Sequence, residues 1–226
     1  MKLKYLKYII NTVICRYSKY FDIKKSFLKF ILYKVRGINN IIKVYNSRVS
    51  KSSFSFNGNS NCIILDNNAN MYYTNINIVG SNNKVTFNGC SGILSLIIRG
   101  NNCEIIIGKD STMETCYMVC MGQGNSIKIG NDCMFSGKVE IWNSDTHLIT
   151  NMEGMCTNPS KPINIGNHVW LGKDVKILKG VTICSNSVIG MGSIVTKDVT
   201  NNSIAAGNPA RIIKKNICWK KGFINV

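Results

Sequence analysis

The sequence predicts an all-β fold, a parallel β-helix in which short strands wind into triangular coils. Aliphatic residues recur every six positions between residues 165 and 195, and small or β-branched residues follow four positions after each of them. Asparagine and glycine recur between these positions. A period of six is neither the 3.6 of an amphipathic helix nor the 2 of a hairpin strand. It fits one short strand plus one corner, so that three units close a coil.

The two periodic series occupy the C-terminal third of the chain. The first is Ile165, Leu171, Ile177, Ile183, Ile189 and Val195, and the second is Val169, Val175, Val181, Ser187, Ser193 and Val199. Stacked coils place such residues in continuous inward ladders. The corners between them need left-handed backbone, which glycine and asparagine tolerate best.

A rougher repeat precedes these residues. Similar segments begin at Gly58, Gly80, Gly100 and Gly124, spaced by 22, 20 and 24 residues. We therefore assign residues 51–211 to the β-helix. Residues 148–162 lack the period and contain two prolines, which predicts a loop extruded between coils.

The N-terminal segment has a different composition. Residues 1–50 contain twelve Lys or Arg and one acid, Asp22. Two helical faces can be drawn in it, Leu3, Leu6, Ile10, Val13, Ile14 and Tyr17, then Phe27, Leu28, Ile31, Leu32 and Val35. We predict a basic amphipathic helical arm at 1–50 and a short C-terminal cap at 212–226. The arm's charge suits an anionic membrane, nucleic acid or a phosphorylated molecule, or is a solvated surface.

Composition limits where the protein functions. The formal charge is +17, and ten cysteines occur without a C-x-x-C spacing or a disulfide-scaffold pattern. No signal-cleavage pattern and no apolar run of ~18 residues is present. We expect a reducing cytoplasm, with peripheral contact on the inner face of the membrane through residues 1–45.

The sequence then resembles a known family. The stretch from Lys161 to Ile183 (KPINIGNHVWLGKDVKILKGVTI), the stretch from Val188 to Val199 and the stretch from Ile204 to Arg211 (IAAGNPAR) resemble the bacterial hexapeptide-repeat acetyltransferases. Residues Asn143–Ile149 (NSDTHLI) resemble the capsule and lipopolysaccharide O-acetyltransferase branch. The resemblance implies a left-handed parallel β-helix, a homotrimer with active sites between neighbouring copies, acetyl-CoA as donor and a histidine base.

By position in the resembling motif, the histidine base of the family corresponds to His147. A neutral imidazole suits removal of a proton from a hydroxyl, since its usual pKa lies near neutrality. The only other histidine is His168, which we interpret as a corner residue. Asp145 or Glu140 would orient the imidazole, although a turn-capping role for Asp145 is slightly favoured.

The remaining candidates concern the two substrates. The resemblance places acetyl-CoA against Lys173, Met191, Thr196, Lys197, Arg211 and Lys214, where cations suit the phosphates. Trp170 and Asn143 are the acceptor-side candidates. Corner positions or packing are the alternative interpretation of these residues. The segment Thr115–Cys120 lacks the asparagine that galactoside acetyltransferases carry near the acceptor.

Several functions remain open beside O-acetylation of a glycan or its precursor. They are acetylation of an antibiotic, N-acetylation of an amino sugar, and a β-helix scaffold without catalysis. Nucleic-acid binding is disfavoured because the periodic body has no groove-reading element. A zinc carbonic anhydrase is excluded because it needs three histidine ligands, and we expect no metal.

Overall fold

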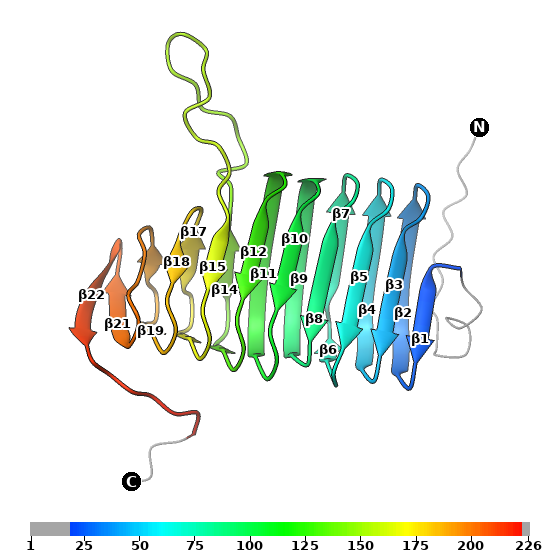
Figure 1. Ribbon diagram of the computed structural model, residues 1–226, viewed down its shortest axis with the longest axis horizontal. Helices are drawn as coiled ribbons and strands as arrows, with labels where there is room; N and C mark the ends of the chain where they lie inside the picture. Colours follow the sequence, from blue (N-terminus) through cyan, green and yellow to red (C-terminus); the bar gives the residue numbers. More distant parts are fainter. Residues whose placement is uncertain (1–18, 223–226) are drawn as a thin grey trace.

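The computed structural model describes residues 19–222 and shows a parallel β-helix with an extruded loop (Figure 1). The predicted fold class is confirmed. Each coil has three faces, numbered in the order in which the chain passes through them. We call the corners after faces 1, 2 and 3 the first, second and third edges.

Face 1 is an eight-stranded parallel sheet. Its strands in spatial order are β1 (Phe21–Lys24), β3 (Ile41–Tyr45), β5 (Cys62–Asp66), β8 (Lys84–Asn88), β10 (Glu104–Ile107), β12 (Ser126–Ile129), β15 (Ile163–Ile165) and β18 (Thr182–Ile183). Successive coils are 20–22 residues apart in the N-terminal part and 18 apart in the last coils.

Faces 2 and 3 are joined because four long strands turn the second edge without interruption. These are β2 (Phe27–Arg36), β4 (Arg48–Asn57), β9 (Ser91–Asn101) and β11 (Thr112–Gln123). Face 2 also contains β6 (Asn70–Tyr72), β13 (Met134–Phe135), β16 (Trp170–Leu171), β19 (Val188–Ile189) and β21 (Ser203–Gly207). Face 3 also contains β7 (Asn75–Val79), β14 (Val139–Trp142), β17 (Lys176–Leu178) and β20 (Ile194–Val195).

The predicted helical arm is wrong wherever the structure describes it. Residues 21–57 form β1 to β4, and Leu28 and Ile31 face the core of the first coil. The apparent helical spacing in 27–35 arises because β2 bends at Phe30, whose positive φ of 55° places Leu28 and Ile31 both inward. Within the described residues the β-helix therefore extends back to Phe21, and not only to residue 51. The first helical face, residues 3–17, lies outside the described residues.

The core is a stack of inward ladders. Every member of both six-residue series is buried, from Ile165 to Val199, as the periodicity predicted. Five cysteines are also buried, at Cys90, Cys103, Cys116, Cys120 and Cys133, where the thiol acts as a small apolar group. Each coil thus covers apolar surface that its neighbour alone would leave exposed.

A column of glycines marks the start of the third edge in the first five coils. Its members are Gly37, Gly58, Gly80, Gly100 and Gly122. A Cβ on Gly80 would lie 1.9 Å from the carbonyl oxygen of Gly100, and the φ of Gly80 is +122°. The column includes Gly122 and not the predicted Gly124, because Gly122 pairs with Gly100 in the strand register.

A ladder of buried asparagines lies at the end of the third edge, just before the next strand of face 1. Asn61 donates from Nδ2 to Asn40 Oδ1 (2.9 Å), and Asn83 donates to Asn61 Oδ1 (3.0 Å). The same Asn40 oxygen accepts the backbone N–H of Asn61 at 3.0 Å. Buried amide groups cost free energy unless they are paired, so this ladder fixes the spacing of coils at the edge.

The C-terminus closes the solenoid with a hairpin. The last strand, β22 (Ala210–Lys215), pairs antiparallel with β21. It begins within the segment predicted as β-helix, and the chain then returns along the first edge as far as residue 222. Within residues 19–222, no helix could cross a membrane.

Gly80→Ala tests the close approach at the third edge. We expect the free energy of unfolding to fall by about 2 kcal/mol or more, because the Cβ meets a carbonyl oxygen and φ is unfavourable. Gly124→Ala is the matched control, since Gly124 has positive φ (64°) but open space around it. It should cost about 1 kcal/mol. Urea unfolding of both variants measures the difference, and equal losses would contradict the role assigned to coil contact.

Candidate active site

The extruded loop leaves and re-enters the solenoid at one point on the third edge. Asn143, directly after β14, accepts the backbone N–H of Lys161 on its carbonyl oxygen at 3.0 Å. Between them the chain projects away from the coils (Figure 1), and a bridge between Thr150 and Cys156 makes the loop a narrow hairpin. The extruded segment lies between Asn143 and Lys161 (Figure 1), where the sequence predicted a loop at 148–162, and this hydrogen bond closes its base.

His147 lies exposed in a turn at the base of this loop. Its backbone N–H donates to the carbonyl oxygen of Asp145 at 2.8 Å, and Thr146 between them has a φ of +66°. The Asn158 amide, from the returning arm, donates to the His147 carbonyl oxygen at 2.8 Å. The backbone that carries the imidazole is therefore fixed from both arms of the loop.

The two acidic candidates for orienting the imidazole are engaged elsewhere. Asp145 accepts from Lys179 Nζ and, at 2.9 Å, from Asn158 Nδ2, and these bonds hold its pKa below the usual value, Lys179 most of all. Glu140 accepts from Lys176 Nζ at 2.7 Å and from Trp142 Nε1 at 2.9 Å, and its pKa is likewise lowered, chiefly by Lys176. Within residues 19–222, no hydrogen bond joins either carboxylate to His147. Asp145 instead stabilises the turn.

His168 has a different environment. Its φ of +53° places it at the first edge, as expected for a corner residue. Nδ1 lies 2.6 Å from Asp132 Oδ2 and Nε2 lies 3.0 Å from the carbonyl oxygen of Trp219. The Trp219 ring stacks on it with centroids 4.0 Å apart. Nδ1 therefore ties His168 to the neighbouring coil, and Nε2 and the stacked ring hold the C-terminal segment against the solenoid.

The cofactor candidates fall into three groups in space. Thr196 and Lys197 lie exposed after β20 on the third edge, the edge that carries His147. Lys173 and Met191 are neighbours on the second edge, where the backbone N–H of Gly192 donates to the Lys173 carbonyl oxygen at 2.8 Å.

The third group, Arg211 and Lys214, lies exposed on β22. One chain therefore brings only the first group to the edge that carries His147.

The two acceptor candidates are not beside His147. Asn143 is fully buried, and its amide bonds to the backbone of Met121, accepting at 2.7 Å and donating at 3.2 Å. The prediction that Asn143 contacts the acceptor is wrong, because this side chain closes the last turn before the loop. Trp170 is 37% exposed on β16 and its ring lies 5.9 Å from that of Trp219. It belongs to the first edge in this chain.

Sequence reasoning did not identify Asn158 and Lys179. Asn158 contacts both Asp145 and His147, and Lys179 contacts Asp145 and the Asn158 carbonyl oxygen. An asparagine before a proline and a lysine before a glycine look like ordinary turn residues. Among residues 19–222, no group of three or more His, Cys, Asp or Glu is placed to bind a metal.

Comparison with known proteins identifies the family. Residues 162–197 match the family described as bacterial transferase hexapeptide (six repeats). The chain is 34% identical over 192 residues to polysialic acid O-acetyltransferase of Neisseria meningitidis, covering 83% of this chain and 89% of the relative. It is 39% identical over 126 residues to polysialic acid O-acetyltransferase of Escherichia coli O1:K1, covering 55% of this chain and 41% of the relative.

A solved structure agrees over most of the solenoid. The polySia-specific acetyltransferase NeuO matches with a TM-score of 0.79 and 32% identity, covering 85% of this chain and 83% of that one. The chain therefore belongs to the hexapeptide-repeat acetyltransferases, as the sequence resemblance implied. The non-catalytic scaffold alternative is thereby set aside.

Lys179→Met tests the contacts among Lys179, Asp145 and Asn158 at the base of the His147 loop. We expect the pKa of Asp145 to rise toward its ordinary value, because the largest cause of its depression is removed. The folded carboxyl has the lower pKa, so the ion pair stabilises the protein above the unfolded pKa of about 3.9 and is lost as pH falls through the lowered value. NMR titration of the side-chain carboxyl measures the pKa of Asp145 in both proteins. Lys176→Met should raise the pKa of Glu140 and leave the pKa of Asp145 unchanged. The reverse pattern would refute the assignment of these two ion pairs.

Proposed function

We propose that this chain transfers the acetyl group of acetyl-CoA to a sugar hydroxyl of a surface polysaccharide or its precursor, with His147 as general base. One observation carries the choice of base. The chain has two histidines, and both ring nitrogens of His168 are hydrogen-bonded, Nδ1 to Asp132 and Nε2 to the Trp219 carbonyl oxygen. His147 is exposed on a fixed turn, and no hydrogen bond to its imidazole is found within residues 19–222.

The chemistry follows from a neutral imidazole at this position. His147 accepts the proton of the acceptor hydroxyl while the oxygen bonds to the acetyl carbonyl carbon. The carbon–sulfur bond then breaks, and the imidazolium returns the proton to the thiolate. The carbonyl oxygen carries negative charge during the step, and backbone N–H groups are the donors expected to stabilise it.

The cationic residues fit the phosphates of acetyl-CoA. Lys197, Arg211 and Lys214 are exposed, and none forms an ion pair within the described residues. Charge-assisted hydrogen bonds from such groups bind phosphate well. Thr196 and Met191 would contribute mainly through the backbone.

A homotrimer would bring the separate groups together. In a triangular prism, the third edge of one copy can lie against the second edge of the next, so that His147 meets Lys173 and Met191 of a neighbour. The loop favours such a partner because Leu148, Met152 and Met155 are each more than half exposed.

The relatives favour a glycan acceptor over an antibiotic or an amino sugar. Two are named for O-acetylation of polysialic acid, an anionic sugar polymer. The charge of +17 suits an anionic polymer by long-range attraction. We place the reaction in the cytoplasm, at or near the inner membrane face.

His147→Asn tests the assignment. We expect transfer to a sialic acid acceptor, followed as a product one acetyl group heavier by mass spectrometry, to fall by about 10²–10⁴-fold. Acetyl-CoA binding and the unfolding midpoint should stay unchanged, because the imidazole has no hydrogen-bond partner within residues 19–222. His168→Asn is the matched control. It should lower the unfolding midpoint and keep transfer within a few-fold, and undiminished transfer by the His147 variant would refute the proposal.

A further inference from the structure

A groove of about 660 Å³ lies along the first edge of the first three coils, far from the His147 loop. Nine residues line it, three from each coil: Lys25, Ser26, Phe27, Asn46, Ser47, Arg48, Asn68, Ala69 and Asn70. Its volume lies within the range of ligand sites for small molecules or single sugar residues.

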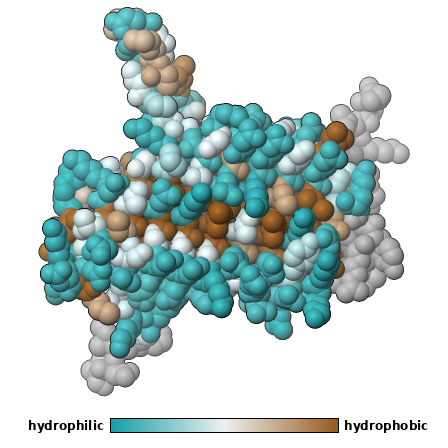
Figure 2. Space-filling model, in the orientation of Figure 1, coloured by the Kyte–Doolittle hydropathy of each residue, from teal (hydrophilic) through white to brown (hydrophobic). Residues whose placement is uncertain are grey.

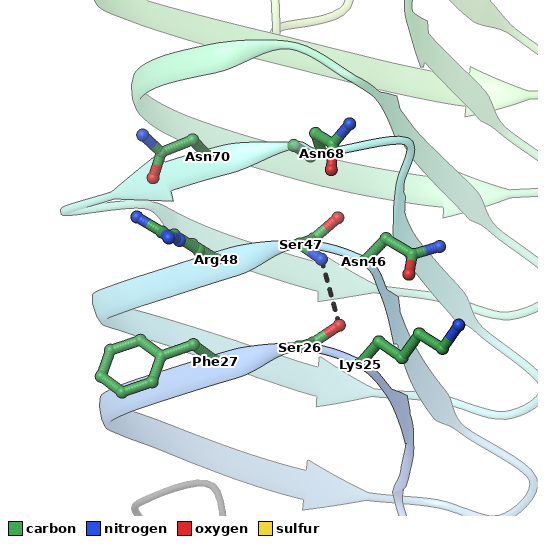
Figure 3. A pocket seen from close by; sticks show the side chains of 9 residues that line it. Lys25, Ser26, Phe27, Asn46, Ser47, Arg48, Asn68 and Asn70 are labelled. Atoms are coloured by element: carbon green, nitrogen blue, oxygen red, sulfur yellow. Dashed lines mark hydrogen bonds between the residues drawn. The ribbon is translucent and has the colours of Figure 1, made fainter.

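Figure 3 shows three parallel rows of side chains. Lys25, Asn46 and Asn68 form one wall at the edge, and Phe27, Arg48 and Asn70 form the other wall on face 2. Ser26 and Ser47 lie between the two rows.

The floor of the groove uses its polar groups internally. Ser26 Oγ accepts the backbone N–H of Ser47 at 3.1 Å, and its single hydroxyl hydrogen can be donated to the carbonyl oxygen of either Lys24 (2.7 Å) or Val44 (2.9 Å). Ala69 adds no polar side chain. A ligand would therefore be bound by the walls, whose side chains are exposed.

The walls carry positive charge without internal neutralisation. Lys25 and Arg48 form no ion pair within the described residues, and no carboxylate lines the groove. The nearest acids along the chain are engaged. Asp22 accepts from the Tyr45 hydroxyl, and Asp66 Oδ1 accepts the backbone N–H of Asn67 at 2.7 Å.

The other wall groups suit a sugar. Amides of Asn46, Asn68 and Asn70 both donate and accept, as neighbouring sugar hydroxyls require. Phe27, 52% exposed, offers an apolar ring to the C–H face of a pyranose. The two cations, Lys25 and Arg48, match the carboxylate of an acidic sugar. The amides and the aromatic ring match its hydroxyl groups and its C–H face.

The hollow continues along the solenoid. Asn70 also lines a second hollow on face 2, together with Tyr72, Ser91, Thr112 and Ser136. These residues lie on or next to adjacent strands from β6 to β13. Stacked strands are spaced by roughly 4.8 Å, so the hollows suit an extended ligand more than a compact one.

We propose that this first-edge groove binds carboxylate-bearing sugar residues of a linear acidic polysaccharide, the polymer that is acetylated at His147. The inference rests on the proposed function and names a second, non-catalytic contact for its acceptor. Binding of one polymer at two places raises the effective concentration of acceptor hydroxyls at the active site. Long chains then have a lower KM than short ones.

Binding and kinetics of the full chain test the groove. The variant Lys25→Asn/Arg48→Gln removes both charges, and asparagine tolerates the φ of 47° at position 25. The matched control, Lys84→Gln/Arg99→Gln, removes two exposed charges on faces 1 and 3 that also form no ion pair within residues 19–222. The probes are long polysialic acid, a sialic acid trisaccharide, neutral dextran, phosphatidylglycerol vesicles and duplex DNA.

The groove variant should bind long polysialic acid about tenfold more weakly than the native chain, with a matching rise in KM and unchanged kcat. The trisaccharide KM, the unfolding midpoint and the control variant should stay within about twofold of native. Dextran should not bind. Equal losses in both double variants would overturn the proposal, because general charge would then explain binding.

Loss of vesicle or DNA binding alone in the groove variant would also overturn it, by assigning the groove to another anion. The two proposals fail separately. If polysialic acid binds through the groove but is not acetylated, the acceptor assignment is wrong and the groove stands. If long and short chains are acetylated alike by both double variants, the groove is wrong and the function stands.

Discussion

Everything in this molecule depends on the close axial stacking of coils in register. Parallel strands on all three faces are held at hydrogen-bonding distance, and the edges must approach equally closely. At the third edge this requires glycine at Gly37, Gly58, Gly80 and Gly100, where a side chain would overlap a carbonyl oxygen of the next coil. At Gly122, the last of the column, a side chain would instead meet the Ser160 hydroxyl. The asparagine ladder beside them saturates the buried polar groups of that edge. Rigid stacking then lets one coil carry an insertion without disturbing the others.

The His147 loop is such an insertion. Asn131 in one coil bonds to Asn167 in the next, although 36 residues separate them where other coils need 18 to 22. The register is restored because Asn143 and Lys161 close the base of the loop. Asn158 and Lys179 then tie both arms to the solenoid, so that an exposed imidazole has a defined position. The coils therefore fix the position of the backbone at the candidate active site.

The sequence allowed prediction of the C-terminal half in detail, because six-residue periodicity directly encodes inward positions from Ile165 to Val199. It failed at 19–50, although the coil there is 21 residues long and the coils between Asn61 and Cys103, of 20 and 22 residues, were assigned correctly. In β2, the positive φ at Phe30 brings Leu28 and Ile31 to one side, which imitates a helix. The third-edge glycines were visible, but Gly124 was chosen where Gly122 stacks, since a two-residue shift is invisible without strand register.

The candidate active site was predictable to a smaller extent for a related reason. His147 and the loop could be found because they interrupt a period. Asn143 was misassigned because burial depends on what the following coil covers, and Asn158 and Lys179 carry no pattern that separates them from ordinary turn residues. Contacts between positions 13 to 34 residues apart, such as Asp145 with Asn158 and Lys179, exist only after the loop has closed.

The two ends of the solenoid have different chemistry on the same scaffold. The last coils, with six-residue units, carry the exposed cations of β22 and the edge beside His147. The first coils carry Lys25 and Arg48 in a groove without carboxylates. Hydrogen-bonded coils run without interruption between these regions within residues 19–222, so the solenoid separates them along its axis (Figure 1). A linear polymer can contact both at once only if it is long enough to span the intervening coils. If the groove binds the polymer as proposed, a preference for long chains follows from this spacing without a conformational change.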